Sequence, residues 1–115
     1  MKDLESKRKS ISEMKTGTHL ATIFDMHLLR DASKAIQHID GCPAIVIHFK
    51  DGKNRLHEQV YVMDGDVRQK YFENMMRAAQ VPKEGESYTK QGAIGKRLYI
   101  SIQECHFVDD DVVVM

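Results

Sequence analysis

Two runs of strand-forming residues, separated by a tight-turn sequence, constrain this chain more than any other feature. Residues 44–50 and 55–62 are rich in β-branched, aromatic and other apolar residues, and residues 51–54 between them read Asp-Gly-Lys-Asn. An Asp-Gly pair between two such runs is a strong local signal for a β-hairpin. We therefore expect two adjacent antiparallel strands in the middle of the chain.

A two-residue tip sets which hairpin side chains share a face. In that register Lys50 faces Arg55 and His48 faces His57, with Tyr61 on the same polar side. Opposed cations on a sheet repel one another mildly, and a bound phosphate would remove that repulsion. The alternative is a solvated hairpin tip whose cations serve solubility. The other face would collect apolar residues for the core, namely Ile45, Ile47, Phe49, Leu56 and Val60.

The segments around the hairpin predict one more long strand and one helix. Residues 18–29 form an extended β-branched and apolar run, which is typical of a long, bent strand, and residues 31–40 then serve as a connection. Asp66, followed by Gln three positions later, is typical of a helix start, and Pro82 ends the helical pattern. The expected buried stripe of this helix contains Val67, Tyr71, Phe72, Met75, Ala78 and Ala79.

The C-terminal third completes the predicted fold. Residues 83–96 contain three glycines and no periodicity, which predicts a long, mobile loop. Alternation over residues 97–103 predicts a half-buried strand, and the valines at 112–114 predict a short last strand. This order predicts a mainly β fold, a five-stranded OB-fold-like Greek-key barrel with one helix between strands three and four.

Length and composition favour a single domain. The 115 residues, 42% hydrophobic and 30% charged, suffice for a core without disulfides or a structural metal. Residues 1–15 contain few apolar positions and predict a flexible charged arm, followed by one domain over residues 16–115. Because 17 Lys and Arg balance 17 Asp and Glu, a nucleic-acid site must be a local cluster of cations.

Cysteine usage and hydropathy indicate a compartment. Cys42 and Cys105 have neither a metal-binding nor a redox spacing, and the charged residues 1–15 do not resemble a leader peptide. Apolar runs such as 44–47 and 112–115 are at most four residues long, far short of the roughly 20 that a membrane span requires. We therefore expect a cytoplasmic protein in a reducing environment, with no membrane partner.

Two segments resemble a known family. Residues 71–81, and residues 94–102 with Gly95-Lys96 ahead of an alternating strand, are similar to small phage and prophage OB-fold proteins regarded as single-stranded DNA-binding. The opening strand and the hairpin are similar as well, so that the resemblance covers residues 16–104. It implies an OB-fold and association with single-stranded DNA in replication or recombination of a mobile element. Lys96 is the one residue whose role it carries over.

A candidate nucleic-acid site combines the polar hairpin face with the 83–97 segment. Its cations would neutralise phosphates, and its tyrosines would stack on bases, each stack contributing about 1–3 kcal/mol. The alternatives are that the tyrosines cap the core and that the 83–97 segment is a surface loop instead of a basic lid. The candidate residues are Lys50, Lys53, Arg55, His48, His57, Tyr61, Lys96, Arg97 and Tyr99.

Other chemistry has weaker support in the sequence. His48 facing His57 resembles half of a zinc site, but no third ligand is placed beside the pair. We expect no cofactor and no enzymatic activity, because neither cysteine has a positioned base and orienting group. The acidic segment 109–115 is similar to the tips by which bacterial single-stranded DNA-binding proteins recruit partners, but its valines are needed for the last strand.

Two functions from different classes follow. The first is binding of single-stranded DNA without sequence preference, with a replication or recombination protein as a further partner. The second is a protein-interaction or oligomerisation module that uses an exposed strand edge to dimerise or to dock. Salt-sensitive binding to oligo-dT would favour the first, and a stable homo-oligomer that ignores salt and oligonucleotide would favour the second.

Overall fold

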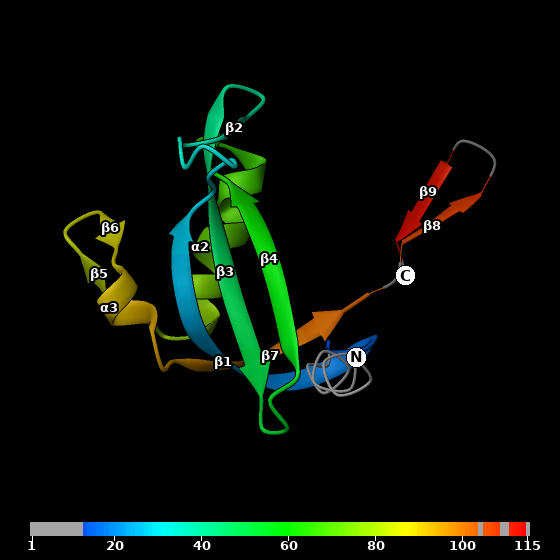
Figure 1. Ribbon diagram of the computed structural model, residues 1–115. Helices are drawn as coiled ribbons and strands as arrows, with labels where there is room; N and C mark the ends of the chain where they lie inside the picture. The colour runs from blue at the N-terminus through cyan, green and yellow to red at the C-terminus, as the bar shows by residue number, and fades with distance from the viewer. Residues whose placement is uncertain (1–12, 104, 109–110, 115) are drawn as a thin grey trace, which may run out of the picture.

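The centre of the molecule is an antiparallel sheet (Figure 1). The computed structural model describes residues 13–103 and the backbone of residues 105–108 and 111–114. The main strands lie in the order β7-β1-β3-β4, the Greek-key arrangement in which the last strand returns beside the first. The prediction of a mainly β, antiparallel fold is confirmed. The strands are β1 (Gly17–Leu28), β2 (His38–Ile39), β3 (Cys42–Asp51), β4 (Leu56–Val62) and β7 (Arg97–Ile102).

Strand β1 joins two neighbours and bends between them. Residues 17–22 pair with β7, and residues 21–28 pair with β3. The register against β3 shifts at Phe24, because Ile23 pairs with Phe49 but Asp25 pairs with His48. A β-bulge of this kind adds one residue to a strand and turns the following side chains to the other face. The long, bent strand predicted from the sequence is therefore present, with its bend marked by Phe24.

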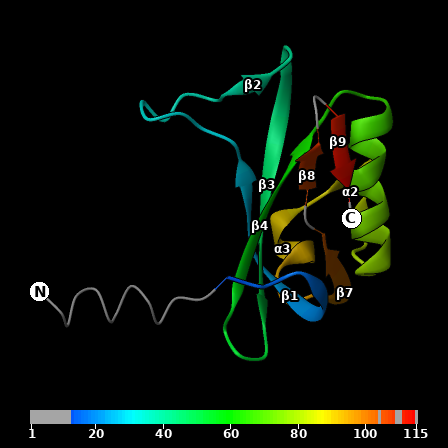
Figure 2. The same cartoon turned by 90° about the vertical axis from the view of Figure 1, so that its right-hand side faces the viewer.

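Helix α2 (Val67–Ala78) covers one face of the sheet (Figure 2). The predicted helix is confirmed, but its buried stripe differs from the expected one. Phe72, Met75 and Met76 are buried, whereas Val67 and Tyr71 are exposed. The buried residues still have helical spacing, but the buried face lies further around the helix axis than the sequence predicted. The angle at which the helix packs on the sheet decides which face is buried.

The start of α2 is stabilised by a residue other than the expected one. Asp66 occupies the N-cap position but makes no side-chain cap hydrogen bond. Instead, Oδ1 of Asp64 accepts hydrogen bonds from the backbone N–H groups of Asp66 and Gln69, and Oε1 of Gln69 accepts one from Gly65. The capping prediction therefore had the right chemistry, with the acidic role at Asp64.

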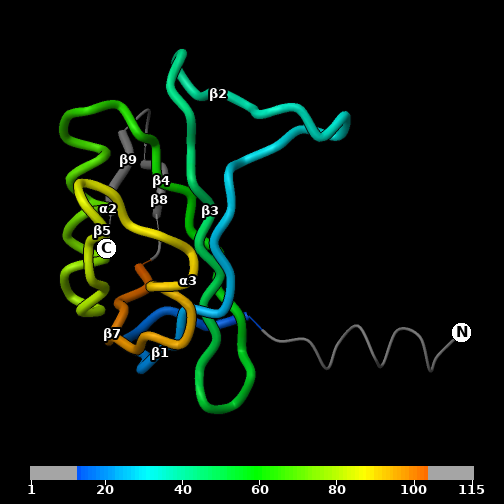
Figure 3. Tube along the Cα trace, turned by 90° about the vertical axis from the view of Figure 1, so that its left-hand side faces the viewer, coloured from blue at the N-terminus to red at the C-terminus, as the bar shows by residue number. Residues whose placement is uncertain are grey.

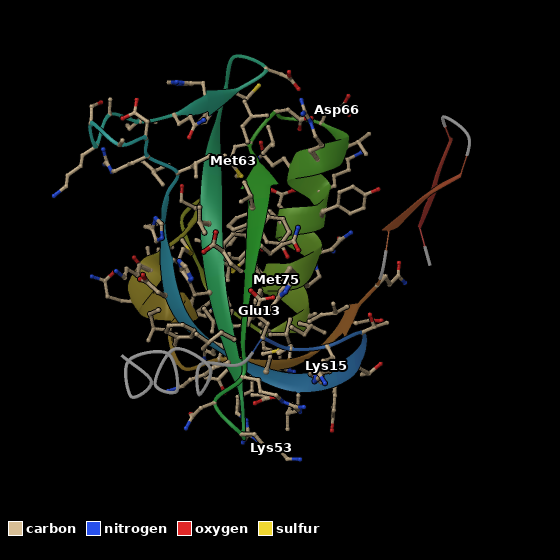
Figure 4. All side chains as sticks on the ribbon, turned by 45° about the vertical axis from the view of Figure 1, so that its right-hand side comes forward. Glu13, Lys15, Lys53, Met63, Asp66 and Met75 are labelled. Carbon is tan, nitrogen blue, oxygen red and sulfur yellow. The ribbon has the colours of Figure 1, made fainter. Side chains whose placement is uncertain are left out.

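The core lies between the sheet and α2. Side chains from alternate positions of β1, β3 and β7 meet those of the helix, and Met75 points from α2 toward the strands (Figure 4). Burial of this apolar surface supplies the main stabilisation of the fold. The fully buried or nearly buried members include Ala21, Ile23, Ile47, Phe49, Phe72, Met76, Ala79, Ala93 and Leu98.

The prediction of a long, structureless loop over residues 83–96 is wrong. The segment forms a small hairpin, β5 (Lys83–Glu84) with β6 (Ser87–Tyr88), and a short helix, α3 (Lys90–Ala93), capped by Thr89. Figure 3 shows it in yellow, folding back alongside α2 before the chain enters β7. Tyr88 packs edge to face on Phe72, and Ala93 is fully buried. These long-range contacts order a segment that has no periodicity of its own.

The predicted hairpin forms β3 and β4, but its register is shifted by one residue. The loop contains three residues, 52–54, with Asn54 in the left-handed conformation, instead of a two-residue tip. Backbone hydrogen bonds join the N–H of Asp51 to the carbonyl of Arg55, and the N–H of Asn54 to the carbonyl of Asp51. Lys50 consequently pairs with Leu56, and His48 with Glu58. Because the side-chain period of a strand is two, this shift moves every β4 side chain to the other face.

The last strand does not close a barrel in the described part of the chain. Residues 112–114 belong to β9 (Asp111–Val114), which pairs with β8 (Cys105–Val108) in a separate two-stranded ladder. The fifth strand of the main sheet is instead β2, within the segment expected to be a connection.

Most of the expected arm, residues 1–12, lies outside the described residues. Within the remainder, Met14 is buried and its N–H donates to the carbonyl of Leu56. Contact with the domain body therefore begins ahead of the expected boundary between residues 15 and 16.

Candidate nucleic-acid interface

The β3–β4 hairpin tip is held rigidly by one carboxylate. Oδ1 of Asp51 accepts hydrogen bonds from the backbone N–H groups of Lys53 and Arg55, at 2.8 and 2.9 Å. Nε of Arg55 lies 2.7 Å from Oδ2 of the same carboxylate. Burial alone would raise the pKa of Asp51, but the hydrogen bonds from Arg55 and Lys53 outweigh it, so that the pKa is lowered. The tip therefore presents its cations from a fixed backbone, with Lys53 at its end (Figure 4).

A cavity of about 440 Å³ lies between this tip and the strands β1 and β7. Three of the predicted phosphate-binding cations, Lys53, Arg55 and Arg97, line it. They come from the hairpin loop and from the start of β7, which the β3–β1–β7 ladders bring together. The other lining residues are Thr18, His19, Leu20, Thr22, Asp51 and Gly52.

The charge around this cavity is positive. Three cations surround it, and Asp51 is the one carboxylate among its lining residues. That carboxylate is only 6% exposed and is paired with Arg55 at 2.7 Å, so that the net positive charge is that of Lys53 and Arg97. Concave surfaces lined by one sign of charge concentrate the opposite ion. The cavity can therefore hold an anionic group such as a phosphate.

Tyr99 lies two residues beyond Arg97 on the same strand and lines a second cavity, of about 320 Å³, instead of the cationic one. It is 73% exposed and pairs with Leu20 of β1, itself 38% exposed. Alternation along β7 places Arg97 and Tyr99 on one face, away from the buried Leu98. An exposed aromatic ring two residues from a cation offers a planar surface on which a base can stack.

Lys50 lies further along the sheet, with an aromatic neighbour that the sequence did not single out. Its Nζ is 5.8 Å from the centroid of the Phe24 ring, a cation–π distance. Phe24 is 37% exposed because it occupies the bulge in β1. Phe24 lies inside the apolar run 18–29, and no local pattern in that run marks the bulge.

Lys96 is half-buried and takes part in the fold through its backbone. The carbonyl of Lys96 accepts a hydrogen bond from the N–H of Ile23. The carbonyl of Ile23 in turn accepts one from the N–H of Gly95. These bonds continue the β1–β7 ladder toward α3. The Gly-Lys pair thus sets where β7 begins, and it is Arg97, the next residue, that lines the cavity.

Two predicted site residues lie on the helix-covered face of the sheet. Tyr61 packs edge to face on Phe72 with ring centroids 5.7 Å apart, and burial raises the pKa of its phenol to about 12. His57 stacks on Phe49. The assignment of both residues to the polar face was wrong, because the three-residue loop shifted the register of β4.

The same shift separates the two histidines proposed as half of a zinc site. His48 lies opposite Glu58, and His57 lies opposite Phe49 on the other face. Nδ1 of His48 is 3.5 Å from Oε2 of Glu58. The ring nitrogen that approaches Nε2 of His48 belongs instead to His27, at 2.9 Å.

No family model matches this chain, and no curated protein matches it. In the part of the chain that the structure describes, no helix combines the length and the hydrophobicity needed to cross a membrane.

Proposed function

We propose that this protein binds single-stranded nucleic acid without sequence preference, through the surface formed by the hairpin tip, β1 and β7. The observation that carries the proposal is the convergence of Lys53, Arg55 and Arg97 on one cavity. Each of these cations can neutralise a phosphate. Tyr99 beside them supplies a stacking surface, which is the second component of sequence-tolerant binding sites.

The architecture supports the same proposal. The order β7-β1-β3-β4, with α2 between β4 and β7, matches the first four strands of an OB-fold, whose strands two and three often bind oligonucleotides. In this chain the proposed surface uses the turn between β3 and β4, which correspond to OB-fold strands two and three. It also uses the outer side of β1 and β7, which correspond to strands one and four. We therefore propose an OB-fold-like half-barrel with its cations gathered at one end.

The first experiment is fluorescence anisotropy of a labelled oligo-dT titrated with the full chain at several salt concentrations. Three neutralised phosphates on a single strand predict a log–log slope of about −2 for affinity against salt. The same titration with oligo-U tests whether the protein distinguishes DNA from RNA. Absence of saturable binding at tens of micromolar protein would contradict the proposal.

Matched charge reversals locate the site. Lys53→Glu and Arg97→Glu are each expected to abolish most of the binding, because each replaces a cation at the cavity by an anion. Lys70→Glu is the control, since Lys70 is an exposed lysine in the first half of α2. Figure 4 shows the helix start, near Asp66, at the opposite end of the molecule from Lys53. Equal losses in all three variants would indicate a diffuse charge effect and would overturn the assignment of the site.

A separate variant tests stacking. Tyr99→Ala is expected to raise the Kd by roughly fivefold or more, in line with about 1–3 kcal/mol for a stacked base, while leaving the salt slope unchanged. Tyr99→Phe should retain wild-type affinity, because stacking requires the ring and not the hydroxyl. Weak binding by the Phe variant would show that the tyrosine acts through a hydrogen bond instead.

A second candidate function is self-association, supported by the open side of the sheet. Among the described strands, β4 pairs only with β3, and β7 pairs only with β1, while an isolated bridge from Glu13 covers Leu56 at the start of the β4 edge. A cavity of about 320 Å³ with a mixed lining, in which Met75, Leu98 and Ile100 stand beside polar residues such as Gln59 and Asn74, separates these two edges. The occupant would be a strand of a second copy, because β9 pairs only with β8 in the described residues and retains an edge of its own.

Light scattering after size-exclusion chromatography tests this candidate. A dimer that persists in high salt and in the presence of oligo-dT would favour self-association, because strand pairing depends little on ionic strength. A monomer at tens of micromolar would contradict it.

A further inference from the structure

The bulge at Phe24 brings three metal-ligating side chains to one face of the sheet. Without the bulge, Asp25 and His27 would alternate onto the helix-covered face with Ile23. With it, Asp25 lies directly opposite His48 of β3, and His27 follows two positions later on the same face. One ligand atom from each of the three lies within 4.8 Å of the other two. This cluster is distinct from the cavity at the hairpin tip.

The two imidazole rings face one another closely. Nε2 of His27 is 2.9 Å from Nε2 of His48, and the ring centroids are 5.1 Å apart with an interplanar angle of 26°. A contact of this length between two ring nitrogens requires something positive between them. It is either a proton carried by one nitrogen or a metal ion shared by both.

The opposite edges of the rings favour unprotonated Nε2 atoms. Nδ1 of His27 lies 3.0 Å from the carbonyl of Leu28, which can only accept, so that Nδ1 carries the proton. Nδ1 of His48 lies 3.5 Å from Oε2 of Glu58, so that a proton on that nitrogen would face a carboxylate. With the proton on Nδ1 in both rings, both Nε2 lone pairs point at the same space. Partners of this kind, a carbonyl or a carboxylate behind the ring, are the ones that orient metal-ligating histidines.

The third ligand is also available. Both contacts of the Asp25 carboxylate, with the N–H of Met26 and with Nζ of Lys90, are made by Oδ1 at 2.9 Å. Lys90 is 57% exposed in its side chain and belongs to the short helix α3, so that its ammonium can swing away into solvent.

We propose that Asp25, His27 and His48 together bind one divalent transition-metal ion, with Zn²⁺ as the best-matched ion. Two imidazoles and one carboxylate suit borderline ions such as Zn²⁺, whereas Ca²⁺ and Mg²⁺ prefer oxygen ligands throughout. Two nitrogen ligands of a tetrahedral zinc lie about 3.3 Å apart, so that a small rotation of the rings accommodates the ion. Solvent supplies the remaining position, because His27 is exposed. Glu58 acts as a positioning residue behind His48.

The test is calorimetric titration of Zn²⁺ into the chelator-treated full chain, without nucleic acid. We expect saturable binding of one ion per chain, and no comparable signal with Mg²⁺. His27→Ala and His48→Ala are each expected to weaken binding by more than roughly tenfold. The matched control is His38→Ala, which removes an exposed histidine from β2 and should leave the Kd unchanged. Circular dichroism of each variant verifies the fold, and His48→Gln substitutes if an alanine variant fails to fold.

Two further variants distinguish a built site from adventitious binding by surface histidines. Glu58→Gln should weaken Zn²⁺ binding by roughly tenfold, because the carboxylate behind His48 is lost. Lys90→Met should strengthen it severalfold, because the competing ammonium is removed from Asp25. Visible absorption of the Co²⁺-substituted protein reports the tetrahedral geometry directly.

Two outcomes would overturn the proposal. One is the absence of saturable Zn²⁺ binding, which would leave a shared proton between the two imidazoles. The other is an equal loss of affinity in His38→Ala and His27→Ala, which would indicate adventitious binding only. Neither result bears on the proposed nucleic-acid surface, because none of the three metal ligands lines the cationic cavity.

Discussion

Tyr61 and Phe72 pack edge to face, with their ring centroids 5.7 Å apart and their planes at 65°. The contact joins β4 to α2 and packs against the core a partly buried tyrosine that the sequence pattern had assigned to a nucleic-acid surface. Aromatic pairs of this geometry stabilise a fold by about 0.5–1.5 kcal/mol beyond the area that they bury. Because the contact exists only in the observed register of the hairpin, titration of the Tyr61 phenol reports on that register.

Titration of the tyrosines tests that register. Burial raises the pKa of Tyr61 from its ordinary 10.0 to about 12. The stabilising contribution of the neutral phenol is therefore complete below pH 10 and is lost as the pH rises from 10 to 12. Ultraviolet absorbance of phenolate should show a late component near pH 12 that Tyr61→Phe removes. A late component that persists in the Phe variant would place Tyr61 outside the core.

A pair of alanine variants tests which face of α2 is buried. Met76 has no exposed surface, whereas Tyr71 is 63% exposed. Met76→Ala should lower the free energy of unfolding by about 2–5 kcal/mol, because it leaves a cavity in the core. Tyr71→Ala should change it by about 0.5 kcal/mol or less. Urea denaturation measures the free energy of unfolding of both variants. Comparable losses in the two would show that Tyr71 is buried, as the sequence pattern predicted.

The C-terminus of α2 offers a stabilising substitution. The N–H groups of Gln80 and Val81 donate to the carbonyls of Arg77 and Met76, a Schellman motif that places Gln80 at φ +57°. Side chains are disfavoured in this left-handed conformation, and glycine is not. Gln80→Gly should therefore raise the free energy of unfolding by roughly 0.5–1 kcal/mol. Gln80→Ala is the control, since it keeps the strain, and it should leave the unfolding midpoint near the wild-type value.

Acid stability should depend on Asp64. Hydrogen bonds from the backbone of Asp66, then from Arg68 and Gln69, lower the pKa of this carboxyl from 3.8 to about 2 despite some burial. Its contribution is therefore complete above about pH 4 and is lost as the pH falls toward 2. Asp64→Asn should lower the Tm at pH 7 and approach the wild-type value at pH 2. Thermal melts followed by circular dichroism across this range test it, and a constant difference at all pH values would contradict the assignment.

The elements that were predictable have local causes. The strands of the hairpin, the extent of α2 and the alternating strand over residues 97–102 all carry their own periodicity and punctuation. The cations of the candidate interface were identified for the same reason, because charge and turn position are visible residue by residue. Lys53, Arg55 and Arg97 were named from sequence, and the structure brings them around one cavity.

The site residues of β4 were assigned to the wrong face because the length of the hairpin tip was wrong by one residue. A two-residue and a three-residue tip both suit the sequence at residues 51–54, and the bonds of the Asp51 side chain accompany the longer one. That choice moved His57 and Tyr61 to the helix-covered face. The pattern of β4 alone favours the shorter tip, because Leu56, Val60 and Val62 alternate with polar or aromatic residues and predict the opposite core face.

The sequence by itself determined a mainly β chain with one amphipathic helix and a cluster of cations around a turn, because each of these depends on neighbours along the chain. The tertiary structure alone decided which histidines meet. His27 and His48 are 21 positions apart, and only the bulge at Phe24, which is set by the pairing of β1 with β3, turns both to the same face. Strand pairing is a long-range interaction, and the position of a bulge depends on which of two alternating patterns buries more apolar surface.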